Sequence, residues 1–282
     1  MEKTSKPIQI EQGVSGAKTP AYQPPKLLTL YRNYENGILG AISVLIFLAI
    51  WELVVTFGWA KPLLVSSPTR IFTAAQWLFA HGFLEDIRIS ATEFFVGYAV
   101  AVGVGIPLGI LLGWYRRLYA TFDPFVSALY ATPRVALLPL LILWLGIGLE
   151  SKMAVVFLGA FFPVLVNTLA GVRTIDEQLL KCARCFGATD RQIFTTLALP
   201  SSIPFVVTGM RLGAGRGLVG VVVGELVAAT GGVGYVMSTA GATFQTDKVF
   251  VGIILLATSG YVMVELLKRI ERRFDYWRPE RG

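Results

Sequence analysis

The sequence predicts an all-α, polytopic membrane protein with about six transmembrane helices. Hydrophobic residues make up 54% of the 282 residues and charged residues only 15%, and the mean hydropathy is +0.63. Lysine and arginine gather at the two ends and in a few short loops. Water-soluble domains carry more charge. Long apolar segments joined by charged loops are typical of helices that cross a bilayer.

The individual spans follow from segment length, because a helix needs about 20 apolar residues to cross a hydrocarbon layer ~30 Å thick. Six segments satisfy this length, namely 38–57, 91–112, 122–145, 153–172, 203–229 and 249–267. The third contains Pro133, Arg134 and Pro139, which leaves open one irregular span or two kinked pieces. Residues 58–90 are expected to form an outer loop with a short interfacial helix at 69–79.

The distribution of basic residues predicts the orientation, because cytoplasmic loops retain lysine and arginine. Seventeen lie on the side that holds both termini, five lie on the other side, and three lie within spans. We therefore expect a cytoplasmic N-terminal tail at 1–35, a membrane domain at 36–270 and a cytoplasmic C-terminal tail at 271–282. The polar residues 1–25 do not resemble a cleaved secretory signal.

Two other classes of function receive little support. The net charge of +7 does not predict nucleic-acid binding, because the basic residues flank apolar segments and form no long solvated stripe apart from the tails. The chain has one histidine, His81, and two cysteines, Cys182 and Cys185. An isolated C-x-x-C lacks the ligands of a zinc site, so we expect no metal and interpret both cysteines as small side chains on a helix face.

The segment 173–202, between the fourth and fifth spans, is too polar to cross the bilayer. Apolar residues recur in it at helical spacing on one face, namely Ile175, Leu179, Ala183 and Phe186. Gly187 is expected to end this helix, and Thr189 or Asp190 to cap a second helix before Pro200. The pattern predicts a compact helix–turn–helix on the cytoplasmic side. A helix pair resting on lipid headgroups is the alternative.

The same segment resembles the EAA loop of the permeases of binding-protein-dependent ATP-binding cassette (ABC) importers. The family pattern is E-A-A, three residues, G, nine residues and I-x-L-P, and the spacing here matches at every step. The corresponding residues are Lys181, Cys182, Ala183, Gly187, Leu197, Leu199 and Pro200. Leu197 replaces Ile, while Lys181 and Cys182 replace the usual Glu and Ala, which puts in doubt the polar contact normally made by that Glu.

The resemblance covers most of the chain after the first span. Segments 97–113, 132–148 and 161–168 look like the nitrate, sulfonate, taurine and bicarbonate branch of the family. This resemblance implies a type I importer fold, a homodimer in the lipid of a bacterial inner membrane, and an external binding protein that delivers substrate. It also implies two separate ATPase subunits, which use ATP and Mg and receive the loop helix in a groove.

The chain is not expected to be an enzyme or to hold a cofactor. It contains no phosphate-binding loop of the form G-x-x-x-x-G-K-[ST]. A G-x-G-x-x-G pattern at 215–220 lies inside an apolar span and follows no strand. Glycines at a spacing of four are better interpreted as two packing stripes, Gly105, Gly109 and Gly113, and Gly209, Gly213 and Gly217.

Charged side chains within spans are costly unless they face a cavity or a partner. Arg134, Arg216 and Glu225 are therefore candidates for the translocation path. Arg134 lies where a helix is broken, as at many ion sites of transporters. Arg216 could attract an anion or could pair with Glu93 or with Glu225 of a second copy. Glu225 would repel an anion and is expected to be a structural partner or gate, while Arg211 is expected to snorkel.

The predicted function is the permease subunit of an ATP-driven importer for a small anion such as nitrate, sulfonate, taurine or bicarbonate. The sequence leaves the substrate open, because the binding protein does most of the selecting in such systems. A secondary transporter or channel is the alternative, but it would show inverted repeats and an ion-coupling site. A membrane enzyme would require a cluster of catalytic side chains near one membrane face.

Overall fold

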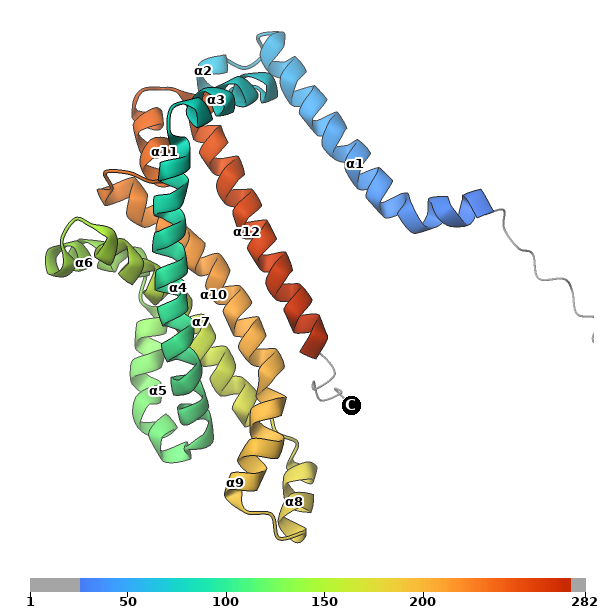
Figure 1. Ribbon diagram of the computed structural model, residues 1–282, viewed down its shortest axis with the longest axis vertical. Helices are drawn as coiled ribbons and strands as arrows, with labels where there is room; N and C mark the ends of the chain where they lie inside the picture. Colours follow the sequence, from blue (N-terminus) through green and yellow to red (C-terminus); the bar gives the residue numbers. More distant parts are fainter. Residues whose placement is uncertain (1–25, 275–282) are drawn as a thin grey trace, which may run out of the picture. The chain divides into compact units, whose positions relative to one another are not determined.

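A computed structural model of the chain describes residues 26–274 as helices joined by short loops, with no strand among them (Figure 1). The chain divides between Ile50 and Trp51 into two compact units, and each is described by itself. The first holds most of α1 (Lys26–Thr56), whose residues 37–50 are all exposed. Helix α1 begins inside the expected N-terminal tail. The rest of that tail, 1–25, and residues 275–282 of the expected C-terminal tail lie outside the described residues.

Five of the six predicted spans are found as continuous helices, and the third segment takes the second of its two predicted forms, a pair of separate pieces. Five of the described helices are long and apolar enough to cross a membrane, namely α1, α4 (Phe83–Trp114), α7 (Leu149–Arg173), α10 (Leu199–Ala228) and α12 (Thr246–Phe274). The segment 122–145 is not one continuous helix. It forms α5 (Arg116–Ala131) and α6 (Leu138–Leu145), which meet at 90° across the short turn η1 (Arg134–Leu137). Pro133 explains the break, because proline disfavours helix in the residue before it.

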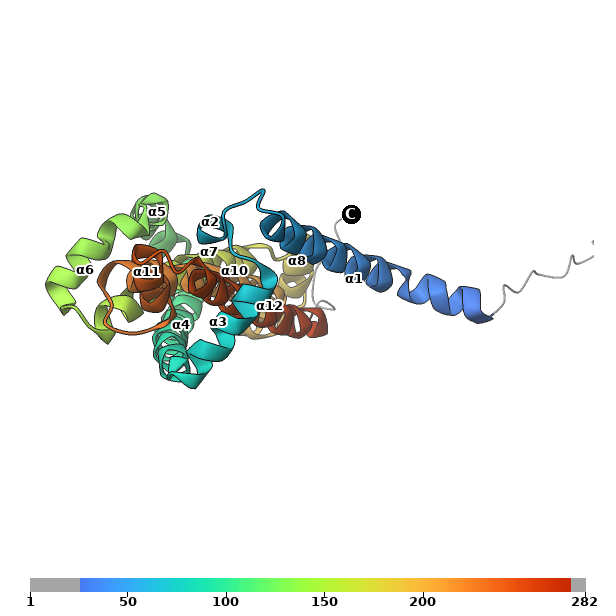
Figure 2. The same cartoon turned by 90° about the horizontal axis from the view of Figure 1, so that it is seen from above.

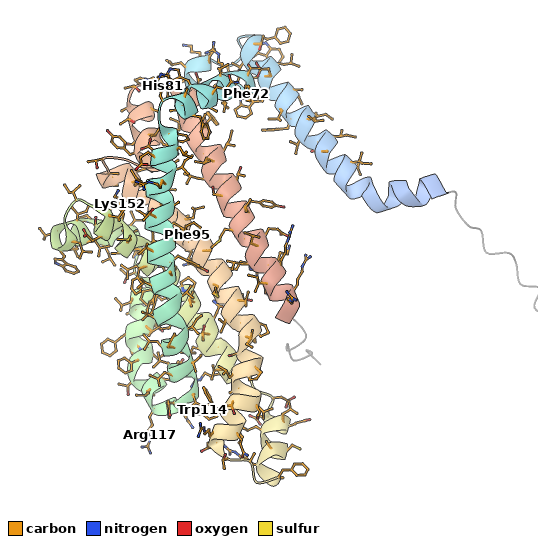
Figure 3. All side chains as sticks on the ribbon, viewed as in Figure 1. Phe72, His81, Phe95, Trp114, Arg117 and Lys152 are labelled. Carbon is orange, nitrogen blue, oxygen red and sulfur yellow. The ribbon has the colours of Figure 1, made fainter. Side chains whose placement is uncertain are left out.

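Short helices lie at the two ends of the second unit (Figure 1). One end carries α2 (Pro62–Val65), α3 (Pro68–Ala80) and α11 (Val233–Ala242). The other, called the loop end below, carries α8 (Glu177–Cys185) and α9 (Asp190–Ile193). Trp114 and Arg117 lie near the loop end, and His81 lies at the opposite end (Figure 3). Helix α3 confirms the short helix predicted at 69–79. Seen from above, α6 lies at one edge of this unit (Figure 2).

Helix α7 is the centre of the second unit, because α4 packs along one of its sides and α10 along another. Glycines make this close approach feasible. A Cβ atom added at Gly109 of α4 would lie 2.7 Å from Cβ of Thr168, and one added at Gly213 of α10 would lie 2.9 Å from the carbonyl oxygen of Ala160. Both predicted glycine stripes therefore pack against α7, as small residues do between helices in lipid.

Candidate functional site

The loop between α7 and α10 is the predicted helix–turn–helix. Helix α8 begins after Asp176, whose side chain accepts a backbone hydrogen bond at 2.7 Å. It ends at Cys185, and two residues later Gly187 has φ +77°, a left-handed conformation that glycine adopts without steric cost. Thr189 and Gln192 form a reciprocal capping box at the start of α9. Of the two residues considered for this cap, Thr189 makes it.

Helix α8 exposes apolar side chains on an otherwise polar element. Phe186 is 87% exposed, and Leu179 is also exposed, while Ala183 on the same predicted face is half-buried. Lys181, at the position of the family's Glu, forms only an exposed ion pair with Glu177, at 3.5 Å. Both cysteines are free and exposed. Helix α8 and the residue after it therefore present apolar side chains outside the apolar spans, and docking of this helix on an ATPase stays a prediction.

The second half of the motif connects the loop to a span. Helix α9 continues through a π-helical turn, η2 (Phe194–Ala198), directly into α10. Leu197 lies in this turn, and Leu199 and Pro200 form the first residues of α10. The ring of Trp114, at the end of α4, packs edge-on against Phe194 with centroids 5.0 Å apart. A movement of α8 and α9 is therefore connected to α10 without an intervening flexible loop.

Two of the three candidate path residues line one cavity. This cavity, called the arginine cavity below, has a volume of about 660 Å³ and is lined by residues of η1, α7, α10 and α12. Arg134 and Arg216 face the same aromatic ring, with guanidinium carbons 5.5 Å and 5.6 Å from the centroid of Tyr130. A third arginine of the lining, Arg211, is paired with Glu271 of α12 at 3.2 Å.

Glu225, the third candidate, is buried outside the lining of that cavity. Its carboxyl oxygens accept hydrogen bonds from Oγ of Ser90 at 2.5 Å and from the backbone N–H of Gly234 at 2.6 Å. Beside it, the buried Glu93 pairs with Nζ of Lys152 at 2.5 Å. A charged group at this depth requires such partners, so these side chains form a structural cluster between α4, α7 and α10.

Lys152 is the residue of this cluster that sequence reasoning missed. It is one of the five basic residues that the charge count placed on the outer side of the membrane, but its side chain is only 6% exposed. It lies on α7 well away from the loop end (Figure 3). Lys152 is thus the partner of Glu93, a role that the sequence analysis considered for Arg216. The sequence offered one signal for this burial, a lysine directly before a long apolar segment. That signal did not decide the matter, because a lysine at such a position can be exposed or can form a buried ion pair.

The cluster also holds the start of α11. The backbone N–H of Gly232 donates to Asp86 at 2.9 Å, that of Val233 donates to Ser90 at 2.9 Å, and that of Gly234 donates to Glu225. These are the groups that a helix leaves without partners at its N-terminus. Gly232 has φ +109°, and a Cβ atom added there would collide with the Glu225 carboxyl group. Side chains of α4 and α10 therefore fix the position of α11.

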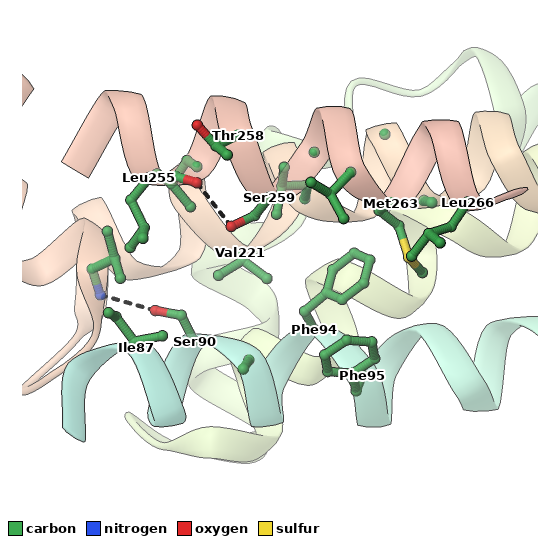
Figure 4. Close-up of a pocket in the computed structure, with 18 residues that line it drawn as sticks. Ile87, Ser90, Phe94, Phe95, Val221, Leu255, Thr258, Ser259, Met263 and Leu266 are labelled. Atoms are coloured by element: carbon green, nitrogen blue, oxygen red, sulfur yellow. Dashed lines mark hydrogen bonds between the residues drawn. The ribbon is translucent and has the colours of Figure 1, made fainter. Parts of the chain in front are cut away.

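A second cavity, of about 410 Å³, has a different chemistry. It lies between α4, α10 and α12, and side chains such as Phe94, Phe95, Leu255 and Met263 surround it (Figure 4). Its lining contains no charged side chain. Such a surface suits hydrocarbon and carries no positive charge that would attract an anion. The arginine cavity is therefore the candidate part of the translocation path.

Comparison with known proteins connects this geometry to a family. Residues 105–276 match the family model described as "Binding-protein-dependent transport system inner membrane component". The aliphatic sulfonates transport permease protein SsuC of Bacillus subtilis is 33% identical over 248 residues, which cover 88% of this chain and 90% of the relative. The taurine transport system permease protein TauC of Escherichia coli is 31% identical over 86% of this chain and 90% of the relative.

Solved structures show the same fold. A chain of the MetNI methionine ABC transporter in an inward-facing conformation superposes with a TM-score of 0.57 at 22% identity, over 76% of this chain and 99% of that one. A chain of an amino acid ABC transporter gives a TM-score of 0.58 at 13% identity, over 71% and 97%. Both are type I importers, so the predicted fold class is confirmed.

The family also settles the kind of protein. Its members are multi-pass components of the inner membrane that work with a binding protein, and their ATPase is a separate subunit. The chain is accordingly a transport subunit and not an enzyme. The chain belongs to the binding-protein-dependent transport system inner membrane component family and is the permease subunit of an ABC importer.

Proposed function

We propose that this permease imports a small anion through a path that contains Arg134 and Arg216. The observation that carries the proposal is that two guanidinium groups of the arginine cavity, those of Arg134 and Arg216, both face the ring of Tyr130. Positive charge at membrane depth attracts an anion and is costly without one. The relatives named for aliphatic sulfonates and taurine support an anionic group in the substrate. Nitrate and bicarbonate belong to the same chemical class.

In this proposal, two copies of the chain form a homodimer and two ATPase subunits dock on their α8 helices. The exposed Phe186 supports the docking surface. Exposed apolar side chains on and after α6 support burial against a second copy or lipid, namely Leu143, Trp144 and Ile147. Glu225 acts beside the path by holding α11, the role of gate or structural partner that the sequence suggested.

The proposed orientation places the loop end and both termini in the cytoplasm. Basic residues near the loop end support it, namely Arg116, Arg117, Arg173, Lys181, Arg184 and Arg191. The test uses single cysteines in a background free of native cysteine, at Ala242 and at Gly16, which lies outside the described residues. An impermeant thiol reagent on whole cells should label position 242 and not position 16. Labelling of position 16 alone would reverse the topology.

The coupling role is tested with Gly187→Val. Valine adopts the left-handed angle of this position only at a cost of roughly 1–2 kcal/mol. A Cβ atom added at Gly187 would meet no other part of the permease within 4 Å, so the substitution causes no clash inside the chain. The variant permease should therefore insert normally but should co-purify less ATPase and lose stimulated hydrolysis and uptake. Gly209→Val is the contrast, because its side chain would meet Asn167 at 2.9 Å and disturb packing in the membrane. Wild-type assembly and transport by Gly187→Val would end the coupling proposal.

A further inference from the structure

We infer that the arginine cavity selects organic anions with an uncharged apolar tail over zwitterions of the same length. The permease would then add its own selectivity to that of the binding protein. This inference rests on the proposed anion import and narrows its substrate class. It follows from three features of the cavity: guanidinium groups without carboxylate partners, a third arginine that is already paired, and walls without acidic side chains.

The charges of Arg134 and Arg216, called the head site below, are poorly balanced by protein groups. Among the side chains that the structure describes, those of residues 37–273 except 228, no carboxylate lies within 4.0 Å of either guanidinium group. The buried Nε of Arg134 has no hydrogen-bond partner, and its Nη2 makes one long contact of 3.4 Å with the Tyr130 carbonyl. Arg216 is close enough to repel it. Paired planar guanidinium groups with free N–H donors suit the oxygens of a sulfonate or carboxylate.

Arg211 does not belong to this head site. Its guanidinium group is paired with Glu271 at 3.2 Å, and the same carboxyl group accepts a hydrogen bond from Thr208 at 2.8 Å. These contacts tie α10 to α12 and balance the charge of Arg211. The two arginines at Tyr130 therefore supply the unbalanced positive charge.

The rest of the wall is apolar. Besides the arginines, it consists of glycines and of aliphatic side chains, namely Val135, Val155, Leu212, Val219, Val223 and Val264. Val219 is 61% exposed, so it offers apolar surface next to Arg216. Aliphatic groups of a ligand gain about 0.8 kcal/mol per buried methylene in such an environment. The volume, about 660 Å³, lies within the usual range of ligand pockets, roughly 300–1,000 Å³.

The same wall penalises an ammonium group. No aspartate or glutamate lines the arginine cavity, and Glu271, the acid that contacts the lining residue Arg211, is engaged by that arginine and by Thr208. An ammonium group that enters the cavity loses water, gains no carboxylate and meets two arginines of its own sign. A zwitterion therefore binds less tightly than the matched anion without the amine.

Ethanesulfonate and taurine are a matched pair of probes, because they differ only in the ammonium group. Their binding to the purified permease–ATPase complex, without binding protein, is measured by isothermal titration calorimetry. Ethanesulfonate should bind at least about tenfold more tightly than taurine, as expected for one uncompensated charge. Arg134→Ala and Arg216→Ala should each weaken ethanesulfonate binding by about tenfold or more. Arg269→Ala removes an arginine that is 72% exposed on α12 and should change nothing.

Each outcome has a separate meaning. Equal or tighter binding of taurine, no binding of either probe to the wild-type complex, or unchanged binding by both arginine variants would overturn the inference. Elution volume and yield of each variant complex identify misfolding, and Arg216→Lys, which keeps the charge, should recover part of the affinity. The proposed function fails on a different measurement, namely if the complete wild-type system imports no anion with ATP.

Discussion

Replacing Glu225 by alanine should release the start of α11. The wild-type carboxyl group accepts hydrogen bonds from Ser90 at 2.5 Å and from the Gly234 N–H at 2.6 Å, and the side chain is almost completely buried. A hydrogen bond to a charged group contributes about 1.5–3 kcal/mol. Losing the Gly234 bond alone should raise the equilibrium constant for local opening by about ten- to 150-fold, since each 1.4 kcal/mol changes an equilibrium constant tenfold.

Hydrogen exchange of the detergent-solubilised permease, followed by mass spectrometry, measures this opening directly. Peptides that contain residues 232–234 should exchange faster in Glu225→Ala by that factor, while peptides from the centre of α7 should not change. Leu226→Ala is the matched control, because it removes the neighbouring side chain, which is 42% exposed, and should leave exchange at 232–234 as in the wild type. Equal exchange of the two variants at these residues would refute the capping role of Glu225.

Further predictions concern packing and docking. Gly109→Val should lower the thermal unfolding midpoint of the solubilised permease, because its Cβ would lie 2.7 Å from that of Thr168. Gly103→Val on the same helix, with no atom within 4 Å, should change it little, and equal midpoints would contradict the packing argument. Phe186→Ala should reduce co-purification of the ATPase without changing permease yield, whereas Trp59→Ala, equally exposed but far along the chain, should not. Retained ATPase in Phe186→Ala would remove that residue from the docking surface.

The features predictable from sequence are those set by local patterns. Helical spans follow from segment length and apolar content, the end of α8 follows from Gly187, and the cap of α9 was narrowed to Thr189 or Asp190, of which Thr189 makes it. The packing role of the two glycine stripes was also predictable, since a spacing of four places the glycines on one helix face. In each case the signal lies within a few residues of the feature that it predicts.

Features that depend on tertiary contacts were not predictable in this way. The pairing of Lys152 with Glu93 joins residues on two helices, and the sequence alone allowed Glu93 to be a partner of Arg216. The 90° bend between α5 and α6 was foreseen only as one of two alternatives. Likewise, nothing local indicates that Ser90 and Asp86 of α4 bind the start of α11. Such contacts depend on the arrangement of whole helices.

The interlocked packing of α7 against α10 has a mechanical consequence. The loop with α8 and α9 is attached at one end to α7 and at the other to α10, and these two helices move together as one body because a close-packed interior transmits strain. Arg216 belongs to that body, because a Cβ atom at Gly159 of α7 would lie 3.0 Å from its carbonyl oxygen. Arg134, on η1 at the bend between α5 and α6, also rests against α7, since its guanidinium carbon lies 5.9 Å from the centroid of the Phe162 ring. A force applied at α8 would therefore move the residues of α7 and α10 that line the arginine cavity together, so the loop and this side of the cavity act as a single mechanical element.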